Sequence, residues 1–210
     1  MDKVMPTIPT KPAGYPRTRF VSLRFPTLVA AILWLSIGGT PSLRAQQPKA
    51  SEFQVKAAYL YNFGRFVAWP DQNPPDGGNV FEICVLGADP FGPTLDATLA
   101  SGTIGGKSVT AKRIAKPEEV DSCRIVFISS SEEKHLKEVL SALDRTSVLT
   151  VSDIPRFSER GGMIGFVLDG NRVRFDVNLA SAQSARLTLS SELLKVATNV
   201  RKDSHPEAFQ

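Results

Sequence analysis

The feature that most constrains the fold is an unbroken apolar run, Ile125 to Ile128. Consecutive apolar residues bounded by polar ones are typical of a strand that is buried on both faces, as in a parallel sheet. Segments typical of strands and of helices alternate along the chain before a final hairpin. We therefore expect a single α/β domain with a mixed, mostly parallel sheet flanked by helices.

Apolar residues repeat at helical spacing from Phe53 to Val67, which predicts an amphipathic helix ending at Trp69-Pro70. Aromatic residues in this stretch, Phe63, Phe66 and Trp69, are more typical of core packing than of a ligand platform. A β-hairpin is expected from Met163 to Leu179, around Asp169-Gly170-Asn171. The other expected elements are strands over 80–86, 109–114 and 148–151 and helices over 91–100, 130–143 and 190–200, the last being a C-terminal helix.

The first 45 residues have the order of zones found in a secretory signal peptide. Three arginines at 17, 19 and 24 precede an apolar run over 28–37, and small and polar residues lead to Ala45. The apolar run is shorter than the roughly 20 residues of a bilayer span, which favours cleavage over a permanent anchor. We expect a signal peptide over 1–45, a polar lead over 46–51, the domain over 52–200 and a flexible tail over 201–210. The rest of the chain is therefore expected to be exported.

The net charge of +4 depends on this N-terminal segment. Removing residues 1–45 leaves 19 basic and 20 acidic side chains, a charge of about −1. Without a basic surface, nucleic acid is not an expected partner.

Motifs for catalysis are weak. Residues 101–108 nearly match the P-loop pattern, but Ser101 replaces its first glycine and the segment runs from a helix into a strand, so a tight turn is favoured. The two histidines, His135 and His205, do not suggest a zinc site or a catalytic triad. A hydrolase built from Asp153, Asp169 and Asp176 is an alternative, although each acid also suits a turn or a surface.

Cys84 and Cys123 are the only cysteines. In an oxidising compartment an even pair suggests a disulfide, which would stabilise the fold by roughly 4 kcal/mol. If the two strands end level, however, the cysteines are three residues out of step, roughly 10 Å along the strand. Two buried free thiols therefore stay an alternative.

Five blocks in order resemble the YfiR-like family of exported proteins. The blocks are residues 55–70, 83–91 with its Ile-Cys-Val-Leu-Gly start, 149–153 (Leu-Thr-Val-Ser-Asp), 161–164 (Gly-Gly-Met-Ile) and 173–179 (Val-Arg-Phe-Asp-Val-Asn-Leu). The resemblance implies a periplasmic, non-enzymatic regulator without a cofactor or metal. The family's best-known member represses an inner-membrane diguanylate cyclase by binding its periplasmic domain, and release raises cyclic di-GMP and favours biofilm.

The resemblance also carries implications for individual residues. Cys84 and Cys123 stand at the positions of a family disulfide, whereas the places of a second pair are taken by Ser158 and Gly165. Family partner contacts involve the hairpin, which nominates Ile164, Arg174 and Asp176 as partner-binding residues. A homodimer is kept open as a further assembly.

The alternative to a regulator is a periplasmic module that binds a small ligand. Its expected site is the pair of strand-end loops at 87–89 and 152–153.

Overall fold

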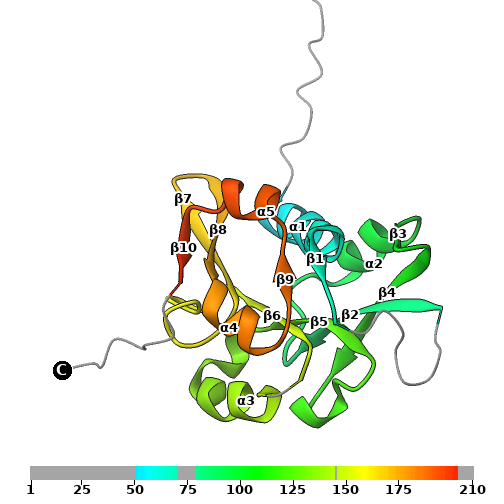
Figure 1. Ribbon diagram of the computed structural model, residues 1–210. Helices are drawn as coiled ribbons and strands as arrows, with labels where there is room; N and C mark the ends of the chain where they lie inside the picture. Colours follow the sequence, from blue (N-terminus) through cyan, green and yellow to red (C-terminus); the bar gives the residue numbers. More distant parts are fainter. Residues whose placement is uncertain (1–50, 71–78, 145, 203–210) are drawn as a thin grey trace, which may run out of the picture. The chain divides into compact units, whose positions relative to one another are not determined.

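The computed structural model describes residues 51–70, 79–144 and 146–202. Within them the main sheet has eight strands in the order β10-β8-β7-β6-β5-β2-β4-β3 (Figure 1). The strands of this sheet are β2 (Val80–Leu86), β3 (Thr103–Ile104), β4 (Lys107–Ile114), β5 (Cys123–Ile128), β6 (Leu149–Ser152), β7 (Ile164–Asp169), β8 (Arg172–Asn178) and β10 (Asn199–Arg201). Five neighbouring strands, β4, β2, β5, β6 and β7, pair in parallel, and β10 is parallel to β8. The pairs β3–β4 and β7–β8 are antiparallel. The expected mixed, mostly parallel sheet is confirmed.

Helices cover both faces of the sheet. The α-helices are α1 (Glu52–Phe66), α2 (Pro93–Leu99), α3 (Leu136–Leu143), α4 (Leu179–Ser184) and α5 (Ser191–Val196), and the 3₁₀ helices are η1 (Pro117–Glu119) and η2 (Ser130–His135). Alternation along β2 divides the core, because Ile83 packs with the cluster of α1 and α2 whereas Leu86 packs with that of α3. Figure 1 shows α1 and α2 on one side of the sheet and α3 on the other.

The first helix follows the predicted pattern. Ser51 and Gln54 form a capping box at its start, in which each side chain accepts the other residue's backbone N–H. Phe63 is fully buried, and its ring lies 5.1 Å from that of Phe175 on β8. After α1, the two-residue strand β1 (Val67–Ala68) pairs with β9 (Thr188–Leu189) in a small antiparallel sheet. The aromatic residue Phe63 is therefore core, as the helical spacing suggested.

Two predicted helices differ from the structure. Over 130–143 the chain begins as the 3₁₀ helix η2, capped by Ser129, and only then continues as α3. Over 190–200 the helix α5 ends at Val196, because residues 199–201 pair with β8 as the edge strand β10. Backbone pairing with the hairpin therefore prevails over helical periodicity in this segment.

Some expectations lie outside the described residues. The signal peptide over 1–45, most of the polar lead and residues 203–210 belong to this group, although Arg201, expected in the flexible tail, is part of β10. Among the helices that the structure describes, none is both long enough and apolar enough to cross a membrane.

Candidate functional site

The terminal hairpin presents a polar face and a buried face. Arg172 and Arg174 are exposed and Asp176 is half-buried, whereas Val173, Phe175 and Val177 between them are buried. Opposite the polar residues on β7 are Asp169, Val167 and Gly165. The predicted alternation along the second strand is therefore present, and it carries two of the three nominated partner-binding residues.

Ile164 is the exception. Its side chain is 0% exposed, and it lies opposite Val177 on the face of β7 that packs into the core. In the described conformation Ile164 is therefore part of the core and offers no exposed apolar contact, and its nomination as a partner-binding residue stays a prediction. The physical reason is its position at the start of β7, where β6 and β8 flank the strand on both sides.

Two exposed apolar residues were not nominated from the sequence. Leu168 is 59% exposed and lies opposite Val173, and Val196 is 58% exposed. Val196 ends α5 and stands two residues before Thr198, whose N–H donates to the carbonyl oxygen of Phe175, so the backbone at Val196 approaches β8 on the side away from β7. The available sequence signal was the place of Leu168 directly before the Asp169-Gly170 turn, where a strand extends beyond its core.

A cavity of about 420 Å³ lies between the start of α1 and the hairpin end. Its lining includes Glu52, Val55 and Tyr59 from α1 and Leu168, Arg172 and Arg174 from the hairpin. The hydroxyl of Tyr59 donates to the carbonyl oxygen of Val173 at 3.4 Å. The cavity therefore lies on the α1 side of the hairpin end, beside Leu168 and Val173, and the two arginines also contribute to its lining.

Asp176 is electrostatically unfavourable in this position. Its partial burial and the negative charge of Glu159 raise the pKa of its carboxyl, and a hydrogen bond from the backbone of Asn199 opposes this rise. A cationic group from another molecule would stabilise the ionised carboxylate. Asp176 is therefore a suitable contact for a basic partner residue.

Buried polar contacts fix the base of the hairpin. The amide of Asn178 donates to the carbonyl oxygen of Ser158 at 2.9 Å, and its side-chain oxygen accepts the N–H of Ser181 at the start of α4. The N–H of Met163 donates to the hydroxyl of Thr150 at 3.1 Å. Since these groups are buried and paired, the base of the hairpin is held in one orientation.

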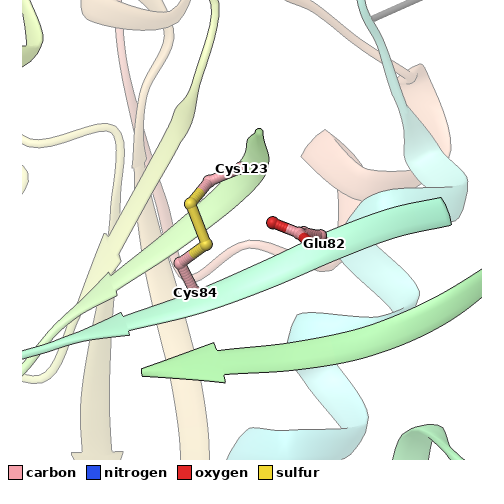
Figure 2. Close-up of side chains that lie close together, drawn as sticks. All are labelled: Glu82, Cys84 and Cys123. Atoms are coloured by element: carbon pink, nitrogen blue, oxygen red, sulfur yellow. A yellow bond between two sulfur atoms is a disulfide. The ribbon is translucent and has the colours of Figure 1, made fainter. Parts of the chain in front are cut away.

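A disulfide joins Cys84 to Cys123, as the sequence suggested (Figure 2). The strands do end level, with Leu86 opposite Ile128, but a β-bulge between Glu82 and Ile83 in the ladder leaves Cys123 opposite Glu82. The bulge shortens the offset to two residues and turns Cys123 to the face of Cys84. Their Cα atoms are 5.8 Å apart. Free thiols, the alternative, are therefore not present.

Glu82 lies beside the disulfide in Figure 2. Its carboxylate accepts a hydrogen bond from Ser122, whose hydroxyl also accepts from the ammonium of Lys112 at 3.0 Å. Among the described residues, only Glu82, Cys84 and Cys123 form a cluster with enough metal-ligand atoms. Both sulfurs are bonded to each other, so this cluster does not offer thiolates to a metal.

The positions of the second family disulfide lie next to each other. A Cβ atom at Gly165 would lie 3.4 Å from the backbone nitrogen of Ser158. This chain therefore keeps the proximity of the two positions without the cysteines.

The strand-end loops proposed for a small ligand make contacts within the chain. The N–H of Ala88 donates to the hydroxyl of Ser131 at 3.0 Å, and the carboxylate of Asp153 pairs with the buried Lys56 at 2.7 Å. These groups are thus used internally, whereas the other carboxylate oxygen of Asp153, Oδ1, is buried and has no hydrogen-bond partner among the described residues.

The three acids of the hydrolase alternative are not brought together. In the β7–β8 ladder, Asp169 lies opposite Arg172 and Asp176 lies opposite Gly165, so the two acids are four ladder positions apart. Asp153 follows the end of β6, where it pairs with Lys56 of α1. Residues 101–108 form the β3–β4 hairpin, with positive φ at Gly105 and Gly106, so the P-loop resemblance is a tight turn. His135 is exposed at the end of η2, and His205 lies outside the described residues.

A family model described as YfiR/HmsC-like matches residues 53–198. Two solved structures are similar in part. A conserved domain protein from Vibrio cholerae O1 biovar El Tor is 9% identical with a TM-score of 0.47, and the match covers 73% of this chain. An ABC domain in complex with L-Trp from Streptococcus pneumoniae is 14% identical with a TM-score of 0.49, and the match covers 69% of this chain. The matched region spans 61% of the length of each of these chains.

Proposed function

The chain belongs to the YfiR/HmsC-like family, and on this premise we propose that it is a periplasmic, non-enzymatic regulator of a membrane-bound diguanylate cyclase. It binds the periplasmic sensor domain of the cyclase and represses its activity. The mechanism is a population shift, in which the protein binds the inactive state of the sensor more tightly than the active state. Its release permits synthesis of cyclic di-GMP.

The family match is the observation that carries this proposal. The match extends over residues 53–198, which include the core clusters on both faces of the sheet, the disulfide and the terminal hairpin. A regulator needs a rigid surface for its partner more than it needs a set of catalytic groups. The separated positions of Asp153, Asp169 and Asp176 fit that requirement better than they fit hydrolysis.

The hairpin end supplies the proposed partner surface, which we define as Leu168, Arg172, Arg174, Asp176 and Val196. Exposed Leu168 and Val196 are the apolar contacts. Leu168 lies on the same face of the hairpin as Val173, whereas the two arginines and Asp176 lie on the other face, so the partner contacts both faces of the hairpin end. Apolar anchors next to charged groups are typical of interface hot spots. Leu168 takes the role first given to Ile164.

Electrostatic complementarity favours a partner patch of mixed sign. Acidic groups of the sensor would pair with Arg172 and Arg174, and a basic group would pair with Asp176. A basic partner group would also offset the repulsion between the carboxylates of Asp176 and Glu159. The hydrogen bonds of Asn178 hold the backbone at the base of the hairpin before binding, which lowers the ordering cost of association.

A direct binding assay tests this proposal. The immobilised periplasmic segment of a membrane diguanylate cyclase from the same genome is titrated with the protein purified from the periplasm. We expect saturable binding that Asp176→Arg and Arg174→Glu weaken about tenfold or more. Lys137→Glu is the matched charge-reversal control, because Lys137 is an exposed residue of α3 outside the proposed surface, and it is expected to leave affinity unchanged. Equal binding by Asp176→Arg and wild type would contradict the proposed surface.

A further inference from the structure

A second cavity lies at the amino-terminal edge of the central strands, away from the proposed partner surface. Its volume is about 350 Å³. The residues that matter for its chemistry are Arg65 from α1, Trp69, Phe81 from β2, Ile104 from β3, Lys107 from β4 and Arg124 from β5, and together they define the cationic pocket. It shares no lining residue with the cavity at the hairpin end.

The charge of this pocket is one-sided. Three of its lining residues are basic, namely Arg65, Lys107 and Arg124, and none is acidic. Within the part of the chain that the structure describes, Arg65 and Arg124 have no ion-pair partner. Two guanidinium groups that line one hollow repel each other, and a bound anion would remove that repulsion.

Trp69, which also lines the pocket, has a hydrogen-bond donor without an acceptor in the described part of the chain. Its indole Nε1 is buried and has no acceptor among the described residues. A buried N–H without an acceptor is uncommon, because leaving it unpaired is unfavourable. An oxygen atom of a ligand in the pocket would supply the acceptor.

The walls of the pocket are packed closely. The Trp69 ring meets Phe81 edge-on, with centroids 5.3 Å apart. A Cβ atom at Gly64 would lie only 2.5 Å from Ile104, so α1 can approach β3 this closely because residue 64 is glycine. The pocket therefore combines fixed aromatic walls with cationic groups, and its volume lies in the usual range for small-molecule sites.

We propose that the cationic pocket binds a small organic oxyanion, with a phosphate or carboxylate group attached to an apolar or aromatic body. The guanidinium groups of Arg65 and Arg124 contact the anionic group, since guanidinium suits both phosphate and carboxylate geometry. The Trp69 N–H donates to the same group, and the Trp69 and Phe81 rings contact the apolar body. Lys107 contributes positive charge at the rim.

Isothermal titration of the protein purified from the periplasm tests this site, with Trp69 fluorescence as a local readout. The probes are phenyl phosphate, benzoate and inorganic phosphate, and neutral benzyl alcohol is the comparison. We expect saturable binding of at least one aromatic anion, at least tenfold tighter than benzyl alcohol. Preference for phenyl phosphate or for benzoate identifies the anionic group, and weak binding of inorganic phosphate identifies the contribution of the aromatic body.

Variants locate the binding. The double variant Arg65→Gln/Arg124→Gln is expected to weaken binding about tenfold or more, and Trp69→Phe keeps a ring but removes the N–H donor, so it weakens binding less. The double variant Arg172→Gln/Arg174→Gln removes the same charge from the hairpin and is the matched control. The proposal is overturned if no anion binds the folded protein saturably, if benzyl alcohol binds as tightly as the anions, or if both double variants weaken binding equally. No partner protein is needed, so this result is independent of the proposed regulation.

Discussion

Cys84 and Cys123 are joined across neighbouring parallel strands although they stand two ladder positions apart. The β-bulge beside Glu82 makes this possible, because the extra residue turns Cys123 to the same face of the sheet as Cys84. Both cysteines are buried in the cluster beneath α3. The bridge therefore ties the start of β5 to the centre of the sheet.

Loss of this bridge is expected to destabilise the protein. The disulfide closes a segment with a sequence separation of 39 residues, so Cys84→Ser/Cys123→Ser should lower the free energy of unfolding by about 4 kcal/mol on the chain-entropy model. Urea denaturation of the wild type and the variant measures the difference. Mass spectrometry of the native protein should detect no alkylatable thiol, and recovery of two would contradict the bridge.

A second bridge should form if cysteines are placed at the family positions. Because the backbone at Gly165 lies against Ser158, we expect Ser158→Cys/Gly165→Cys to oxidise within one chain. Non-reducing peptide mapping would identify the new link, with each single variant as the control. Formation only of intermolecular dimers would show that the two positions are not aligned for bonding.

The buried ion pair between Lys56 and Asp153 gives a third prediction. Lys56 is only 3% exposed, and its ammonium lies 2.7 Å from Asp153 and 2.5 Å from Glu52. Asp153→Leu removes the more buried of the two acidic partners and leaves Lys56 with the more exposed Glu52, so it should lower the free energy of unfolding by up to about 3 kcal/mol.

The double variant Lys56→Met/Asp153→Leu removes both charges and should recover most of that loss. A thermodynamic cycle over the two single variants and the double variant measures the coupling. Additive losses would mean that Lys56 and Asp153 do not depend on each other.

Asp176 should make the protein less stable as the pH rises, whereas most carboxyl groups of folded proteins have the opposite effect. Its pKa is raised in the folded protein, so the folded state binds a proton more tightly than the unfolded state does. Its ionisation therefore opposes folding above its folded pKa, and this penalty disappears as the pH falls through the folded and then the unfolded pKa.

Asp176→Asn should thus stabilise the protein slightly at pH 7, by less than about 1 kcal/mol because the carboxylate is partly screened by water. The stabilisation should vanish in acid. Melting curves from pH 3 to 7 compare the two proteins, with Asp169→Asn at the hairpin turn as the control. A variant that is less stable than the wild type at pH 7 would mean that the carboxylate makes a favourable contact.

The periodic parts of this fold could be predicted from the sequence. The strand Val80–Leu86, the buried run of β5 and the hairpin around Gly170 each have a local signal in the side-chain pattern. By contrast, β10 depends on pairing with β8, and its residues resemble the end of a helix. Long-range pairing has no local sequence signal, which explains this difference.

The same limit applies to the candidate site. Alternation identified the polar face with Arg174 and Asp176, but it does not say how far the core extends along β7. Ile164 and Leu168 are both apolar residues of the same strand, yet Ile164 is fully buried and Leu168 is exposed beyond the core. The bulge at β5 was also not predictable, because it adds a residue without changing the apolar pattern of the strand.

The central claim is repression of a membrane diguanylate cyclase through the hairpin surface. The most direct measurement is the rate of cyclic di-GMP synthesis by the full-length cyclase from the same genome, held in nanodiscs and titrated with this protein. We expect wild type and Lys137→Glu to lower the rate to the same extent and Asp176→Arg to leave it near the starting value. An unchanged rate with wild type would rule out repression of this cyclase, and equal repression by Asp176→Arg would rule out the hairpin surface.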